Sequence, residues 1–229
     1  MSVYIDVWHR THPLTPAAHA RFLDYYATNV VSPPSAFFEV VGGFRYTDGT
    51  SNEDFALYRY ESMAKIEESM MSFGADPDFL SATETIFADI DIEETRGIAI
   101  HAPYSPEERL DEIISERAPR GAAAASTRLR RYVRIVRTSG GMHRPRAFEA
   151  LGILRDQVEK AGSARLVTSF HYLVGPVMDL VELWVLPEGA VEWPQGEDGG
   201  DSGLKAELAE IAPERERRGL VPTAFSKLR

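Results

Sequence analysis

The chain contains no cysteine among its 229 residues, which excludes disulfide bonds, thiolate nucleophiles and zinc sites built on cysteine. It also has no apolar run near the roughly 18 residues that a membrane-spanning helix needs. Its N-terminus alternates polar and apolar residues and lacks the pattern of a signal peptide. We therefore expect a cytoplasmic protein without a membrane partner.

Positive charge is scarce as well. The chain has 25 Lys and Arg against 35 Asp and Glu, a formal net charge of -10. Sequence-independent binding of nucleic acid depends on Lys and Arg that neutralise phosphates, so this balance argues against a nucleic-acid partner. Nucleotide-binding loops are also missing, because Gly42-Gly43 and Gly140-Gly141 lack the spacing that cradles a phosphate.

Strand and helix patterns alternate in the first part of the chain. Residues 3–10 have the period of two that is typical of a strand, and Thr15-Pro16 has the residues of a helix N-cap and first helical position. A second helix is expected in two pieces, divided at Asp76-Pro77. Further strands are predicted at 36–46, 55–61 and 95–101.

The same order of elements then repeats. A helix is predicted at 145–161 and another around Leu208, and a short helix at 106–116 precedes the repeat. Strands are predicted at 128–138, 165–174, 178–186 and 220–228. We therefore divide the chain into a first half at 1–103, a linker at 104–127 and a second half at 128–229.

Matching residues support an internal duplication. Tyr4 corresponds to Tyr132, and Leu57-Tyr58 corresponds to Leu183-Trp184, at offsets of about 126 to 128 residues. Each half has the order βαββαβ of a ferredoxin-like unit. The sequence therefore predicts an α+β protein made of two tandem ferredoxin-like halves.

Three motifs of the first half resemble the NIPSNAP family. They are Tyr58-Arg59-Tyr60-Glu61-Ser62-Met63, then Ala75-Asp76-Pro77-Asp78-Phe79, then Glu94-Thr95-Arg96 leading to Ala102-Pro103. The family has a W-R-Y-E-S-L-like strand, an A-D-P-E-W-like break between helices and an E-N-R-like last strand. The resemblance covers nearly all of the first half, whereas the second half fits by topology.

The resemblance implies a dimeric α/β barrel, in which two four-stranded antiparallel sheets face each other and helices cover the outside. A fused pair would form this barrel within one chain, as a monomer or a homodimer. The wider superfamily includes oxygenases, isomerases, cyclases and haem-binding enzymes, so fold does not decide function. The family's first strand, Y-E-L-R-x-Y, is Tyr4-Ile5-Asp6-Val7-Trp8-His9 here and lacks the Glu and Arg.

Three side chains are candidates for acid or base catalysis. Asp6 is flanked by Tyr4 and Trp8 on one face of a strand, where burial without a partner would raise the pKa of its carboxyl group. A nearby cation would instead make Asp6 part of a structural ion pair. His9 points to the opposite face of the same strand, and His171 lies on the hairpin of the second half.

Aromatic side chains on the predicted strands are candidates for holding a planar apolar ligand, because a ring with one polar edge can both pack and orient. The alternative is that they fill the space between the sheets, and Arg59 is better explained as a structural residue. The candidate binding residues are Tyr4, Trp8, Tyr58, Arg59, Tyr60 and Trp184.

Metal and cofactor sites are poorly supported. His9 and His12 lie on opposite faces of a strand, so they do not form a metal site with His19. His19 is the best candidate for a haem ligand, but the apolar stripe of its helix passes beside it, and we expect it to be solvated. We expect no metal and no cofactor, with reduced flavin as the alternative.

The leading hypothesis is a metal-free oxygenase of secondary metabolism that acts on a small hydrophobic aromatic or polyketide-like molecule. The alternatives are an isomerase or cyclase that uses His and Asp as acid and base, and a binding protein without catalytic activity. We expect the working site in the first half, where Trp8, His9 and Tyr58 gather.

Overall fold

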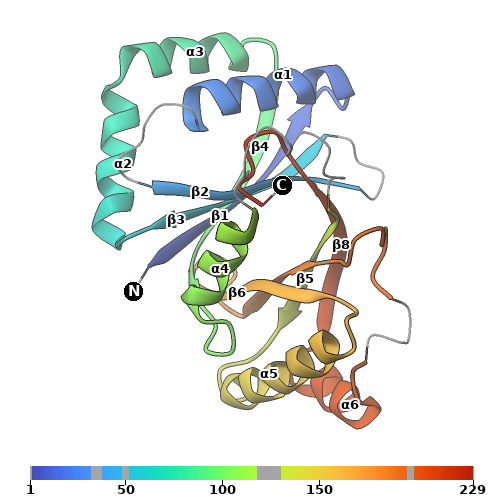
Figure 1. Cartoon of the computed structure of the whole chain (residues 1–229). Helices are drawn as coiled ribbons and strands as arrows, with labels where there is room; N and C mark the ends of the chain where they lie inside the picture. The colour runs from blue at the N-terminus through green and yellow to red at the C-terminus, as the bar shows by residue number, and fades with distance from the viewer. Residues whose placement is uncertain (1, 32–37, 48–51, 118–129, 195–198, 229) are drawn as a thin grey trace.

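A computed structural model describes residues 2–31, 38–47, 52–117, 130–194 and 199–228 (Figure 1). The strands of the first half are β1 (Val3–His12), β2 (Phe38–Tyr46), β3 (Glu53–Tyr60) and β4 (Asp91–His101). Those of the second half are β5 (Tyr132–Thr138), β6 (Arg165–Val174), β7 (Asp179–Val185) and β8 (Glu214–Pro222). The helices are α1 (Pro16–Tyr26), a π-helical turn (Ala27–Val31), α2 (Met63–Ala75), α3 (Pro77–Phe87), α4 (Glu107–Arg117), α5 (Arg144–Lys160) and α6 (Ser202–Ile211).

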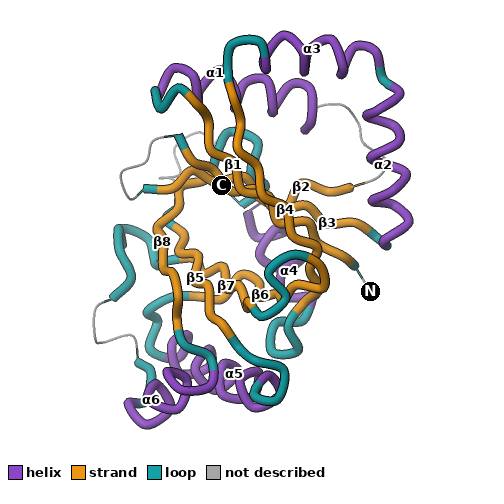
Figure 2. Tube along the Cα trace, turned by 180° about the vertical axis from the view of Figure 1, so that it is seen from behind, coloured by secondary structure: helices purple, strands orange, loops and turns teal. Residues whose placement is uncertain are grey.

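The eight strands form one closed antiparallel barrel in the order β1-β3-β2-β8-β5-β7-β6-β4. Each half contributes a sheet of the same order, β4-β1-β3-β2 and β8-β5-β7-β6 in the path around the barrel. The sheets join through β2 with β8 and through β4 with β6. The α1, α2 and α3 helices cover the first sheet, and α5 and α6 cover the second (Figures 1 and 2). The predicted α+β fold of two ferredoxin-like halves in one barrel is confirmed.

The strand register supports the duplication read from the sequence. Tyr4 of β1 pairs with Arg59 of β3, and Tyr132 of β5 pairs with Val185 of β7. Arg59 and Val185 are separated by the same offset as Leu57 and Leu183, so equivalent strands pair at equivalent residues.

Local sequence determines where the helices of the first half begin. The Thr15 hydroxyl accepts a hydrogen bond from the Ala18 backbone N–H, and Pro16 follows as the first helical residue. Asp76 ends α2 and caps α3 by accepting from the backbone N–H groups of Asp78 and Phe79. The split second helix is therefore present, with its break at Asp76-Pro77 as predicted.

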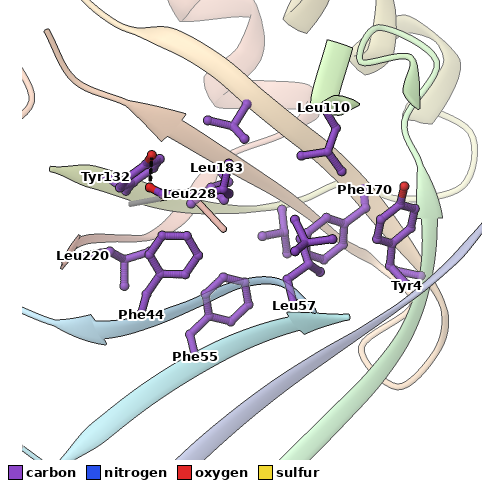
Figure 3. Close-up of a cluster of buried hydrophobic side chains, with 14 of the residues drawn as sticks. Tyr4, Phe44, Phe55, Leu57, Leu110, Tyr132, Phe170, Leu183, Leu220 and Leu228 are labelled. Carbon is purple, nitrogen blue, oxygen red and sulfur yellow. Dashed lines mark hydrogen bonds between the residues drawn. The ribbon is translucent and has the colours of Figure 1, made fainter. Parts of the chain in front are cut away.

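The interior of the barrel is packed with side chains. Rings and aliphatic groups from facing strands point toward one another, and Leu110 of α4 reaches the same cluster (Figure 3). Phe44 and Phe55 stack with ring centroids 5.8 Å apart, and Tyr132 donates a hydrogen bond to the Leu228 carbonyl. Close packing of apolar groups therefore fills most of the space between the two sheets, where we expected a ring-lined hollow. A cavity of about 340 Å³ remains between the halves, with Trp8, Tyr46 and Tyr172 among its walls.

Several predicted boundaries were wrong. The last strand spans 214–222 rather than 220–228, because its charged residues are neutralised by ion pairs such as Arg218–Glu53, at 2.5 Å. Apolar periodicity does not reveal such a strand. The strand predicted at 95–101 begins four residues earlier, at Asp91.

The start of β5 at Tyr132 is later than predicted, and 128–129 lie outside the described residues, as do residues 118–127 of the predicted linker. The predicted short helix is present as α4, whose Leu110 and Ile113 are fully buried. The division into halves and linker stays a prediction. Among the described residues, no helix is both long and apolar enough to cross a membrane.

Candidate ligand-binding cavity of the first half

A cavity of about 350 Å³ lies between the sheet of the first half and helices α1, α2 and α3. Its volume falls in the range of small-molecule sites, which is roughly 300–1,000 Å³. We call it the first-half cavity. The side chains that line it include Ile5, Val7, His9, Phe22, Tyr25, Tyr26, Phe38, Tyr58, Tyr60, Ser69, Met70, Phe73, Phe79, Phe87, Ile92, Glu94 and Arg96.

The cavity exists because α2 and α3 bury little of their surface against the sheet. Only Ile66 and Ser69 of α2 are buried, and only Ile86 of α3. The space between is bordered by aromatic rings, with Phe73 packed at a centroid distance of 4.8 Å from Phe79 and 6.1 Å from Phe38. The walls therefore offer flat apolar surfaces to a ligand.

His9 lies at the centre of the polar part of the wall. Its Nδ1 is 2.8 Å from Asp54 Oδ1, and its Nε2 is 3.2 Å from Glu94 Oε2. The rings of Phe22 and Tyr26 each contact the imidazole edge-on at a centroid distance of 5.0 Å. Both ring nitrogens are thus engaged with carboxylates, and apolar rings enclose the rest of the side chain.

The two carboxylates determine the protonation state of His9. Burial opposes a positive charge, but Asp54 and Glu94 outweigh it and raise the pKa of His9 to about 9. For Glu94, burial likewise opposes the charge, while His9 and Arg96 hold the pKa of its carboxyl group down at about 2. At neutral pH His9 is an imidazolium and Glu94 a carboxylate.

Alternation along β4 places Glu94 and Arg96 on the same face of the strand. An Arg96 NH2 group donates to Glu94 Oε2 over 3.1 Å, and the carboxylate remains partly accessible, with 31% of its side chain exposed. Asp54, by contrast, is buried behind His9. Glu94 is therefore the carboxylate of this cluster that a ligand can reach.

A hydrogen-bonded pair of tyrosines forms another polar part of the wall. Tyr58 donates to the hydroxyl oxygen of Tyr26, and burial raises the pKa of both phenols. Two hydroxyl groups that share one hydrogen bond retain one further O–H proton. The pair can therefore donate to an oxygen atom of a ligand.

The structure brings only some of the predicted residues to this cavity. His9, Tyr58 and Tyr60 line it. Asp6 lies on the opposite face of β1, inside the barrel, where Tyr172 donates to its Oδ2 and Arg134 NH2 is 3.3 Å away. The structural ion pair considered for Asp6 is therefore present.

Three predicted binding residues also lie on that inner face of the first sheet. Tyr4 is in the barrel core, with its hydroxyl 2.7 Å from His101 Nε2. Trp8 packs against the same core, and Arg59 is ion-paired with Glu39 and with Asp111, the latter at 2.6 Å. A strand places alternate residues on opposite faces, so these residues cannot reach the first-half cavity.

His171 and Trp184 lie in the second half, far along the chain from these groups. His171 points toward α5 and contacts Phe148 at a centroid distance of 5.5 Å. Trp184 is buried under α5 and α6 and packs against Trp193 at 5.4 Å. The three predicted catalytic residues are therefore not brought together.

Sequence reasoning missed several groups that surround His9. They include Tyr26 of α1 and Asp54 of β3, neither of which is a candidate in the sequence. Glu94 and Arg96 were noted only as part of a family-like motif. Glu94 and Arg96 are two residues apart on a strand that neighbours the strand of His9, and this spacing could have identified them.

His19 is buried rather than solvated, which corrects our expectation. Its Nδ1 is 3.4 Å from the Thr11 hydroxyl, and its Nε2 is 3.9 Å from Asp54 Oδ2. Burial lowers the pKa of its imidazole. The buried face of α1 includes His19 as well as Ala18, Phe22 and Tyr26.

Neither a haem nor a flavin mononucleotide fits the polar groups of this wall well. Among the described residues that line the cavity, His9 is the one histidine, and both of its nitrogens already face carboxylates. A flavin phosphate would need cationic partners, whereas Arg96 is held by Glu94. Nowhere in the described parts of the chain do three His, Asp or Glu residues group as a metal site.

Comparisons with known proteins identify related folds. No protein-family model matches the chain, and no curated protein matches it in sequence. The chain is similar to a solved "anthrone oxidase-like protein", with a TM-score of 0.60, 12% identity and coverage of 96% of this chain and 91% of that one.

It is also similar to two proteins described as proposed monooxygenases. For the one from Lactobacillus acidophilus NCFM the TM-score is 0.55 at 7% identity, covering 97% of this chain and 94% of that one. For the one from Fusobacterium nucleatum subsp. nucleatum it is 0.53 at 9% identity, covering 96% and 91%. At these identities the similarity shows a shared fold and nothing further. The chain therefore has the dimeric α/β-barrel fold, formed within a single polypeptide by two tandem halves.

Proposed function

We propose that the protein is an oxygenase that acts on a small, hydrophobic, aromatic or polyketide-like molecule bound in the first-half cavity. The observation that carries this proposal is the combination of ring-lined walls with the cluster of His9, Glu94 and Arg96 and the Tyr26–Tyr58 pair. Apolar walls select a flat apolar substrate, and a few polar groups orient its oxygen atoms.

Oxidation of a ring methylene to a carbonyl by O₂ is a suitable reaction, because it balances without an added reductant. Two C–H bonds and the O–O bond break, one oxygen atom becomes the carbonyl oxygen on the former methylene carbon, and the other leaves as water. All four electrons that reduce O₂ come from the substrate. The protein then has to supply position, a proton acceptor and stabilisation of an anion.

Glu94 is the group that accepts the proton. An apolar substrate that fills the cavity displaces water from this carboxylate, which raises its pKa and strengthens it as a base. The substrate anion places its charge on a ring oxygen, which accepts a hydrogen bond from the Tyr26–Tyr58 pair. Arg96 and protonated His9 stabilise that charge, O₂ adds to the carbon, and Glu94 returns the proton to the peroxide. Glu94 then removes the second C–H proton as the O–O bond breaks, and the departing hydroxide takes this proton and leaves as water.

Two further lines support this proposal. The structurally similar proteins named above are described as anthrone oxidase-like and as proposed monooxygenases. The resemblance to the NIPSNAP family stays a prediction, but its Glu94-Thr95-Arg96 motif supplies two of the polar groups on the cavity wall. A cytoplasmic location and a monomeric or dimeric state also stay predictions.

The test is oxygen uptake by the purified protein with anthrone as the probe. We expect one O₂ consumed for each quinone formed, and a loss of turnover in Glu94→Gln. Glu149→Gln, an exposed residue of α5, is the matched control and should retain full activity. Conversion that continues unchanged under argon would favour the isomerase or cyclase, and binding without conversion would favour the non-catalytic alternative.

A further inference from the structure

A second cavity, of about 340 Å³, lies between the two halves and is separate from the first-half cavity. We call it the inter-half cavity. Its walls include Asp6, Trp8 and Tyr46 from the first half, and Arg134, Tyr172 and Arg218 from the second. Because both halves supply its walls, neither half could form it alone.

Three buried polar atoms of its wall residues have no hydrogen-bond partner among the described residues: Asp6 Oδ1, Arg134 Nε and Asp179 Oδ2. Asp179 Oδ2 is ion-paired with Arg215 at 2.6 Å, which leaves Asp6 Oδ1 and Arg134 Nε. Only 5% of the Asp6 side chain and 11% of the Arg134 side chain are exposed. A buried acceptor and a buried donor without partners are costly, so a ligand that satisfies both gains affinity.

Asp6 and Arg134 occupy equivalent positions of the duplicated fold. They are separated by the same offset as Tyr4 and Tyr132, and they contact each other across the barrel. Two identical subunits would place like charges here. Divergence of the halves has therefore produced an acceptor beside a donor, which a symmetric pair cannot do.

The remaining walls indicate a neutral and flat ligand. The described lining residues include four arginines and four carboxylates, so their formal charges cancel. Aromatic rings of Trp8, Tyr46 and Tyr172 supply planar surface, and the Arg218 guanidinium lies 3.6 Å from the centroid of Tyr46.

Gly97 makes room for one of these rings. A Cβ atom added at Gly97 would lie 2.2 Å from the ring of Tyr172, so a glycine is needed where this ring crosses β4. Tyr172 in turn donates its hydroxyl to Asp6 Oδ2 and leaves Oδ1 free for another donor.

We propose that the inter-half cavity binds a small, neutral, planar heterocycle with a cis-amide edge. The ring N–H donates to Asp6 Oδ1, and the adjacent carbonyl oxygen accepts from Arg134 Nε. This site is independent of the proposed oxygenase reaction, because its residues lie on the opposite face of the first sheet.

The proposal is tested by titrating the protein with uracil and measuring binding by calorimetry and by tryptophan fluorescence. Of the three tryptophans, Trp8 lies on this wall, whereas Trp184 and Trp193 pack together in the second half. We expect saturable binding with a fluorescence change that persists in Trp184→Phe and is lost in Trp8→Phe. 1,3-Dimethyluracil, which has no N–H, should bind at least about tenfold more weakly.

Asp6→Asn tests the acceptor directly. Arg134 and Tyr172 orient the amide oxygen toward themselves, which places the amide NH₂ where Oδ1 was and replaces an acceptor by a donor. We expect at least about tenfold weaker uracil binding in the folded variant.

If this variant does not fold, the affinities of the wild-type protein for uracil and for 1,3-dimethyluracil still test the proposal. No binding of uracil at about 10 mM, equal binding of dimethyluracil, or binding of glycine in preference to uracil would each overturn the proposal.

Discussion

The two halves of the barrel share a topology but differ in how their helices meet the sheet. In the first half, α2 and α3 leave much of their apolar surface outside the core, including Met70, Met71 and Phe87. In the second half, α5 buries Ala147, Ala150, Leu151, Leu154 and Val158. Small residues let α5 approach its sheet closely, whereas the split helix of the first half leaves a cavity.

Residues at equivalent positions of the two halves differ in the same way as the helices do. Tyr58 of the first half lines the first-half cavity, whereas the corresponding Trp184 is fully buried and packs against Trp193 under α5 and α6. At the Tyr4–Tyr132 offset, His9 corresponds to Arg137, which is paired with Glu182 at 3.0 Å. Arginine stays charged at every accessible pH, whereas histidine can exchange its proton. The comparison indicates that one half is specialised for ligand binding and the other for stability.

Truncation of Trp184 should give the largest effect. Because this ring is fully buried in the second half, Trp184→Ala should lower the free energy of unfolding by about 3–5 kcal/mol. Tyr58→Phe removes only one hydroxyl and should cost about 1 kcal/mol. Urea unfolding of the two variants measures the difference, and equal losses would contradict the assignment of stability to the second half.

Removal of the proposed base should reduce turnover without unfolding the protein. Glu94→Gln should lower kcat about 10²–10⁴-fold with anthrone, because general-base catalysis contributes about that much. Stability should change much less, since the side chain is partly exposed. A variant with normal kcat would remove Glu94 from the mechanism.

The His9 cluster should make stability depend on pH. The pKa of His9 is raised in the folded protein, so its contribution is complete below about 6.5 and is lost as pH rises through about 9. Glu94 has a lowered pKa, so its contribution is complete above about 4.5 and is lost as pH falls through about 2.

The cluster should therefore stabilise the protein most between about pH 4.5 and 6.5. Unfolding measured at pH 6 and pH 9.5 should differ by up to about 3 kcal/mol more in the wild type than in His9→Asn. If the free energy of unfolding changes equally between these two pH values in both proteins, His9 is not held as an imidazolium.

The smallest expected effect concerns the helix caps. Asp76→Ala removes the side-chain cap of α3 and should cost about 1 kcal/mol. His143→Ala is the matched substitution at α5, whose N-cap makes no side-chain hydrogen bond, and should change stability by less than about 0.5 kcal/mol. Thermal unfolding of both variants measures the difference between the two stability losses. Equal losses would show that packing, and not the Asp76 cap, holds α3 in place.

Much of the fold could be predicted because it depends on local signals. Three kinds of signal can be recognised from the sequence alone. They are the cap residues Thr15 and Asp76, the apolar alternation of β1 and the match between Tyr4 and Tyr132. The strand at 214–222 was misplaced because its stability depends on ion pairs with distant residues such as Glu53. Such partners become neighbours only when the barrel closes.

The candidate site was predicted less completely. Alternation in β1 correctly placed His9 and Asp6 on opposite faces, but it did not indicate which face borders a cavity. Cavities border both faces: the packing of α2 and α3 leaves space beside His9, and the meeting of the two halves leaves space beside Asp6. The partners Asp54 and Glu94 come from other strands, so the spacing along β1 carried no sign of them.

A crystal structure of the protein with anthrone, grown and soaked under argon to prevent turnover, tests the central claim most directly. We predict density for a planar ligand between the first sheet and helices α1 to α3, with an oxygen atom at the Tyr26–Tyr58 pair. Anthrone bound under α5 and α6, or a first-half cavity closed by its own side chains, would contradict the account.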